Sequence, residues 1–157
     1  MALQLILGNA GAGKSHYIFE KIIQENCFYV DKTAFIKEWW ENEDVVTLIT
    51  RPRRFGKTLN MDMLNCFFSN KFTDRGDLFE GLEIWKEEKY RKLQGTYPVI
   101  FISFAAVKGD TFEITKQQIV TQIVHLFEEK RFLLDADVMS ESEKIKYKQF
   151  VLEPEKF

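Results

Sequence analysis

The sequence has few residues of the kinds that mark disulfide-stabilised, metal-binding or membrane-spanning proteins. It contains 2 cysteines and 2 histidines in 157 residues. Cys27 and Cys66 lack C-x-x-C spacing, which argues against a disulfide framework and a cysteine metal site, so we expect two buried free thiols. Residues 3–7 form an apolar run that is too short for a signal sequence or a membrane span. We therefore expect a cytoplasmic protein without a membrane partner.

The sequence also lacks a strong charge of either sign. Its net charge is −2, with 45% hydrophobic and 29% charged residues. This balance is typical of a globular chain, and it excludes a general basic field that would hold nucleic acid through its phosphates. Any anion site must therefore be local. The length suits one domain better than two.

Strand and helix patterns alternate along the chain. Residues 3–7, 45–50 and 99–104 are predicted strands, and the last two are continuous apolar runs typical of strands buried on both faces. Helical periodicity opens near Lys14 and at Lys57. The alternation predicts an α/β fold with a mainly parallel sheet flanked by helices.

Polar residues are placed to start the remaining helices. Asp31 is positioned to cap a helix. Asp110 with Glu113, and Ser140 with Glu143, have the spacing of capping boxes, in which each side chain accepts a hydrogen bond from the other end of the first turn. We expect long helices after both pairs.

A glycine-rich loop near the N-terminus matches a phosphate-binding pattern. Residues 8–15 read GNAGAGKS, which fits G-x-x-x-x-G-K-S between a strand and a helix. In that pattern backbone N–H groups face one anion, Lys14 reaches the β- and γ-phosphates of ATP, and Ser15 binds Mg²⁺. A glycine turn that matches by chance, or a relic, is the alternative. The candidate nucleotide-binding residues are Gly8, Gly11, Gly13, Lys14 and Ser15.

A second loop joins the run at residues 45–50 to the next helix. Residues 51–58 read RPRRFGKT. Arg51 replaces the first glycine of the pattern, and Pro52 removes one backbone donor. Clustered cations at a helix N-terminus oppose the helix dipole, and an anion would relieve that conflict, although a solvated basic turn is the alternative. The candidate residues are Arg53, Arg54, Phe55, Gly56, Lys57 and Thr58, with Thr58 on Mg²⁺.

Four motifs resemble the bacterial AAA-ATPase-like family. They are CFYVDKT at 27–33, LITRPRRFGKTLN at 48–60, FEGL at 79–82 and YPVIFISF at 97–104. The resemblance implies that the arginine-rich loop is this family's form of the Walker A phosphate loop, in an incomplete P-loop NTPase-like domain that binds ATP. It also implies that a nuclease-like domain often follows, and such a domain would be the only route to nucleic acid.

The first part of the chain resembles a different family. Residues 1–24, MALQLILGNAGAGKSHYIFEKIIQ, are similar to the N-terminus of the B subunit of AddAB-type helicase-nucleases. That likeness implies ATP binding and recombinational DNA repair for the intact subunit. We therefore expect a fusion of an appended strand, loop and helix (1–26) with a truncated AAA-ATPase-like domain (27–157), joined between Phe19 and Asn26.

The acidic strand that the AAA-like family uses to hold its metal is not evident. Residues 132–137 read FLLDAD, which we interpret as a helix end or loop, and not as a Walker B strand. Phosphoryl transfer needs such a carboxylate and a water-positioning residue besides the phosphate loop. We expect at most one nucleotide site, at the second loop, in an ATP-binding fragment with weak or no hydrolysis. The alternatives are an AddB-like helicase-nuclease fragment and an inactive truncated product.

Overall fold

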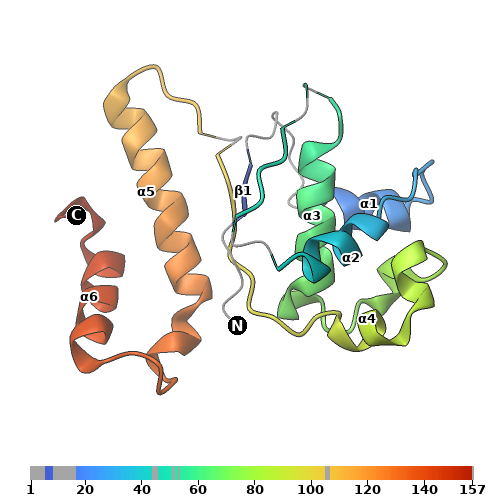
Figure 1. Ribbon diagram of the computed structural model, residues 1–157. Coiled ribbons are helices and arrows are strands. Elements are labelled where there is room, and N and C mark those ends of the chain that lie inside the picture. The colour runs from blue at the N-terminus through green and yellow to red at the C-terminus, as the bar shows by residue number, and fades with distance from the viewer. Residues whose placement is uncertain are drawn as a thin grey trace. The chain divides into compact units, whose positions relative to one another are not determined.

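The computed structural model describes residues 6–8, 17–43, 46–50, 52, 54–104 and 107–156. Its elements belong to two compact units, Met1–Ala105 and Ala106–Phe157 (Figure 1). The first unit contains β1 (Ile6–Gly8), α1 (Ile18–Gln24), α2 (Ala34–Glu41), α3 (Lys57–Phe68), η1 (Asn70–Phe72), η2 (Gly76–Phe79), η3 (Glu83–Lys86), α4 (Glu88–Leu93) and β2 (Phe101–Ser103), where η is a 3₁₀ helix. The second contains α5 (Phe112–Glu129), η4 (Arg131–Leu134), α6 (Glu141–Leu152) and η5 (Pro154–Lys156).

The predicted α/β fold is wrong, because the described structure is mostly helical. β1 and β2 pair in parallel, with Leu7 opposite Ile102, but each strand is 3 residues long. Beyond this pair, the described residues add a single isolated bridge between Ser69 and Tyr97. This short pair is not the mainly parallel sheet flanked by helices of a P-loop NTPase-like fold that the sequence predicted.

The strand expected at residues 45–50 does not form in the described part of that run. Residues 46–50 have no strand partner, and the side chains of Val46 and Leu48 are both 82% exposed. Trp39 Nε1 donates a hydrogen bond to Thr47 Oγ1 in this run at 3.1 Å. A β-branched run favours a strand only where neighbouring strands pair with it and cover it, and such neighbours are missing from the described residues.

Helix α3 forms the centre of the first unit. Every residue from Met61 to Phe68 is buried. Phe67 meets Phe79 edge to face at 5.1 Å, and Phe68 stacks on Trp40 at 5.4 Å between ring centroids. Such aromatic burial contributes roughly 1.5–3 kcal/mol per side chain. The helix predicted to begin at Lys57 is therefore confirmed, and so is its wide buried surface.

The N-terminus of helix α1 is capped by a side chain from α3. Its own N-cap residue, Tyr17, makes no side-chain cap, while the backbone N–H of Phe19 donates to Asp62 Oδ2 at 2.8 Å. Asp62 is buried, and among the described groups no partner reaches its Oδ1. Burial raises the pKa of Asp62 to about 6, against the opposing hydrogen bonds from the N–H groups of Phe19 and Ile18. The helix expected to open near Lys14 is described from Ile18 onward.

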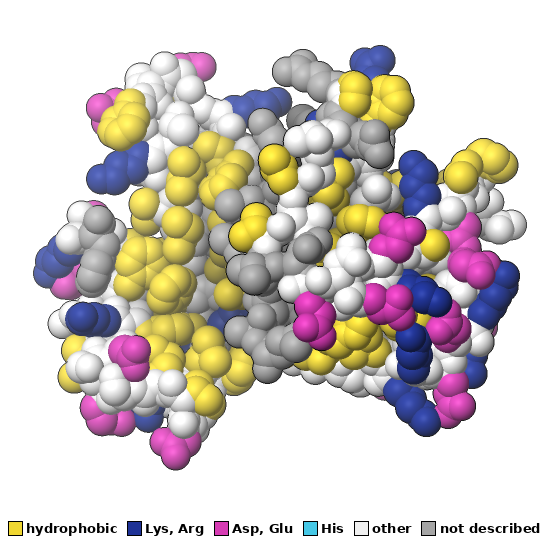
Figure 2. All heavy atoms as spheres, viewed as in Figure 1, with side chains coloured by type: hydrophobic (Ala, Val, Ile, Leu, Met, Phe, Trp, Pro, Cys, Tyr) yellow, Lys and Arg dark blue, Asp and Glu magenta, His cyan; other side chains and the backbone are white. Residues whose placement is uncertain are grey.

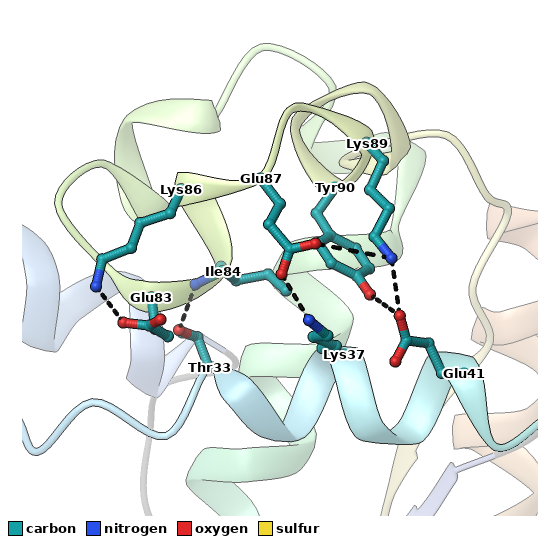
Figure 3. Close-up of polar contacts among 9 residues, drawn as sticks. All are labelled: Thr33, Lys37, Glu41, Glu83, Ile84, Lys86, Glu87, Lys89 and Tyr90. Atoms are coloured by element: carbon teal, nitrogen blue, oxygen red, sulfur yellow. Dashed lines mark hydrogen bonds and ion pairs between the residues drawn. The ribbon is translucent and has the colours of Figure 1, made fainter.

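Polar contacts fix α2 to the segment that contains η3 and α4 (Figure 3). The Nζ of Lys37 lies 2.7 Å from Glu87 Oε1, and the Tyr90 hydroxyl donates to Glu41 Oε1, also at 2.7 Å. The hydroxyl of buried Thr33 accepts a hydrogen bond from the N–H of Ile84 at 3.1 Å. Exposed ion pairs contribute little, so the buried threonine bond carries more of this attachment.

The second unit is a helical hairpin of α5 and α6 (Figure 1). The capping box of Ser140 and Glu143 is confirmed at the start of α6. The other predicted box is wrong, because Thr111 is the N-cap of α5 and its hydroxyl accepts from the N–H of Ile114. A threonine one residue after Asp110 offers the same type of acceptor in the extended conformation that an N-cap needs.

The hairpin has a small aromatic cluster. The ring of Phe127 lies 4.7 Å from both Tyr147 and Phe150, and the Tyr147 hydroxyl donates to the carbonyl of Phe127. Apolar side chains gather over α5 and α6 in Figure 2, and several are largely exposed, among them Phe112 at 75%. The predicted helices are thus present, but the second unit buries far fewer apolar residues than the first.

Candidate phosphate-binding site

The second glycine loop turns into α3 through a left-handed glycine. Gly56 has φ 75° and ψ 16° and is the N-cap of the helix, and its carbonyl accepts from the N–H of Asn60 at 2.9 Å. Arg54 also has a positive φ, of 68°. Alternating left- and right-handed residues turn neighbouring N–H groups to one side, the arrangement that protein backbones use to bind anions. Glycine adopts this conformation without the strain that a Cβ brings.

The start of α3 offers positive potential from its helix dipole. Gly56 has no side-chain cap, and the first turn of the helix contains no acidic residue. The first N–H groups of any helix have no acceptor within the helix, and its dipole places positive charge there. Lys57 is the first helical residue and Thr58 the second, and both are half-buried. A phosphate group fits such a helix start.

The structure describes five of the six residues predicted at the second loop. Arg54, Phe55, Gly56, Lys57 and Thr58 lie consecutively at this turn, with Phe55 62% exposed. Of the first loop, only Gly8 is described, and it pairs with Ser103 at the end of β1. Arg53, Gly11, Gly13, Lys14 and Ser15 lie outside the described residues.

A further cation, Lys32, lies beside the turn. A Cβ placed on Gly56 would be 3.9 Å from Lys32 Nζ. Sequence reasoning missed this residue, because Lys32 is far from the loop along the chain and belongs to no phosphate-loop pattern. The one signal in the sequence that could have pointed to Lys32 was its place in the CFYVDKT motif, which resembles the AAA-ATPase-like family.

Comparison with protein families decides what kind of chain carries this loop. The family described as "Predicted AAA-ATPase" matches residues 16–153. The chain belongs to this AAA-ATPase-like family. The match includes the second loop and Lys32 and begins after Ser15, so the first glycine loop is outside it. No curated protein and no solved structure matches the chain.

The AAA-ATPase-like chain shows little metal-binding chemistry where it is described. In those ranges, no group of three or more His, Cys, Asp or Glu side chains could hold a metal ion. The acidic run at 132–137 begins within η4, a 3₁₀ helix, which agrees with its interpretation as a helix end and not a strand. Thr58 stands in the first turn of α3, and its assignment to Mg²⁺ stays a prediction.

The remaining sequence expectations concern the cysteines, the charge and the membrane. Cys66 is buried, and burial raises the pKa of its thiol, whereas Cys27 is exposed and its predicted burial is wrong.

Acidic and basic side chains intermix on the face of the first unit in Figure 2, as a net charge of −2 suggests. Among the helices of the described ranges, none combines the length and the apolar character that crossing a membrane requires.

Proposed function

We propose that this AAA-ATPase-like chain binds ATP with Mg²⁺ at the turn before α3. The observation that carries the proposal is the position of Lys57 and Thr58 in the first turn of a buried helix, directly after a left-handed glycine. Backbone N–H groups from Gly56 to Thr58 would receive the phosphates, because they stand at the positive end of the helix. The family membership supports this use of the loop.

Each side chain of the turn has a defined task in this proposal. Lys57 would contact the β- and γ-phosphates, and Thr58 would bind the Mg²⁺ that bridges them. Arg54 would add positive charge at the turn, and Arg53, outside the described residues, is predicted to contribute as well. Phe55, with 62% of its side chain exposed, is available to cover a bound base or ribose. The bound metal would supply charge neutralisation for phosphoryl transfer.

Hydrolysis is proposed to be slow or absent. Phosphoryl transfer also needs a carboxylate at the metal and a group that orients water. In the ranges that the structure describes, the first turn of α3 holds no acid, and residues 131–134 form the 3₁₀ helix η4 and not a strand. An inactive product is the competing interpretation, and steady phosphate release that Lys57→Ala abolishes would exclude it.

The first glycine loop is a rival nucleotide site. Gly8, Gly11, Gly13, Lys14 and Ser15 remain a prediction, since all but Gly8 lie outside the described residues. The AddB-type likeness rests on the same short stretch, and no comparison supports it, so we do not put forward a role in recombinational repair. Contact with nucleic acid through a nuclease domain, and a cytoplasmic location, also remain predictions.

Titration of a fluorescent, non-hydrolysable ATP analogue with Mg²⁺ tests the proposal. Charge-assisted hydrogen bonds contribute about 1.5–3 kcal/mol, so Lys57→Ala should weaken binding by at least about tenfold. The matched variant Lys14→Ala should bind like the wild type. Equal affinities in all three proteins would end the proposal, and loss with Lys14→Ala alone would move the site to the first loop.

A further inference from the structure

Lys32 is held beside the phosphate loop by its two neighbours. Asp31 Oδ1 accepts hydrogen bonds from the N–H of Thr33 at 2.8 Å and from its hydroxyl at 2.7 Å. Asp31 Oδ2 accepts from the N–H of Glu83 at 2.7 Å. Thr33 in turn receives the N–H of Ile84, as Figure 3 shows. The backbone on both sides of Lys32 is therefore fixed to η3, and this fixes the direction from which the lysine approaches Gly56.

The carboxylate nearest along the chain is committed elsewhere. Burial favours the neutral form of Asp31, but hydrogen bonds from Thr33 and Glu83 outweigh it and lower the pKa of that carboxyl. Glu83 itself pairs with Lys86. No ion pair joins Lys32 Nζ to an acidic side chain anywhere in the described ranges. Within the described part of the chain, Lys32 thus brings to the loop a positive charge that is not paired with an acidic side chain.

A bound anion would stabilise this charge at its position. Its ammonium would lie 3.9 Å from a Cβ on Gly56, at the positive end of α3, where the helix dipole repels cations. Lys57 and Arg54 add further positive charge to the same turn. Cations gathered at a helix N-terminus repel one another as well as the dipole, and a polyphosphate removes both repulsions.

We propose that Lys32 is a second phosphate-contacting lysine of the nucleotide site, supplied by a segment outside the loop. This inference rests on the proposed function, because it assigns the ligand of Lys32 to the polyphosphate bound at Gly56–Thr58. The site then has two sides: the turn into α3 with Lys57, and the segment before α2 with Lys32. The hydrogen bonds of Asp31 and Thr33 hold the Lys32 segment in place next to the turn into α3.

Two substitutions at this position separate charge from packing. Lys32→Gln removes the charge and should weaken binding of the fluorescent ATP analogue about tenfold. Lys32→Arg keeps the charge and should stay within about threefold of the wild type. Lys86→Gln is the matched control, since Lys86 is also an exposed lysine beside Asp31 but pairs with Glu83, and it should bind like the wild type. Thermal unfolding of each variant should show an intact fold.

Salt adds a readout that a structural role would not change. Exposed charges are screened by salt, so the wild-type affinity should fall more steeply with KCl than that of Lys32→Gln. Unchanged affinity in Lys32→Gln, or equal loss in Lys32→Gln and Lys32→Arg, overturns the inference. If Lys57→Ala weakens binding while Lys32→Gln does not, the proposed function stands and Lys32 has no part in it. If neither matters, both proposals fail together.

Discussion

Helices α3 and α5 carry similar apolar stripes in the sequence and have opposite surroundings in the structure. In α3 every residue from Met61 to Phe68 is buried, including the polar ones, whereas no described residue of α5 is buried. Helix α3 is surrounded by elements of its own unit, while α5 packs within its unit on α6 and η4. The pattern of apolar residues therefore predicts that a helix forms and which stripe is apolar, but the number of covering elements decides how far that stripe is buried.

The largest change in the free energy of unfolding is expected when an aromatic ring is removed from α3. Phe67 is completely buried and its ring lies 5.0 Å from Phe68 and 5.1 Å from Phe79. Phe67→Ala should lower the free energy of unfolding by about 3–5 kcal/mol, because the cavity cannot collapse around rigid aromatic neighbours. Urea unfolding followed by tryptophan fluorescence measures it. A loss below about 1 kcal/mol would show that α3 is not the centre of the core.

A second test uses the carboxylate that α3 buries. Burial raises the pKa of Asp62 to about 6, and nearby Glu20 raises it further, while the N–H groups of Phe19 and Ile18 oppose the rise. The folded chain therefore keeps the proton at pH values where the unfolded chain has released it. The stability from this proton is fully present below the unfolded-state pKa of about 3.8 and is lost as the pH rises through about 6.

The Asp62→Asn variant has no charge to bury at any pH. Its free energy of unfolding, relative to that of the wild type, should rise by on the order of 2–3 kcal/mol between about pH 4 and pH 7.5. Parallel urea titrations of both proteins across this range give the difference. Parallel pH curves for the two proteins would mean that Asp62 titrates normally and that α3 is more open than its burial indicates.

The smallest effect is expected at a phenylalanine of α5. Phe112 is 75% exposed, so Phe112→Ala should change the free energy of unfolding by less than about 0.5 kcal/mol, in the same urea assay as Phe67→Ala. The two variants delete the same side chain from two helices and differ only in its surroundings. If Phe112→Ala lowered the free energy of unfolding by more than about 2 kcal/mol, the Phe112 side chain would have to be more buried than its 75% exposure indicates.

Local signals in the sequence predicted local structure well. The spacing of apolar residues located α3 from Lys57, and Ser140 with Glu143 located the start of α6, since both depend on residues within one or two turns. At α5 the same capping logic chose Asp110, although Thr111 makes the bond. Neighbouring cap residues offer the same acceptor, so spacing alone does not separate them.

Features that depend on distant segments were not predictable in this way. Residues 46–50 have strong strand propensity, but a strand forms only beside a partner strand. The sequence of this run does not determine which segment, if any, pairs with it. The same limit applies to the site. The turn at Gly56 follows from its own residues, whereas the approach of Lys32 depends on the bonds from Asp31 and Thr33 to η3.

The bond from Phe19 to Asp62 has a practical consequence for dividing the chain. Phe19 is completely buried and stacks on Phe79 at 5.2 Å, while its N–H satisfies a carboxylate in the middle of α3. A shortened protein that starts after residue 26 would lose this ring and leave Asp62 without its donors. Whatever the origin of the first segment, its helix has become a structural part of the module that follows, and the loop before α3 is best studied with α1 retained.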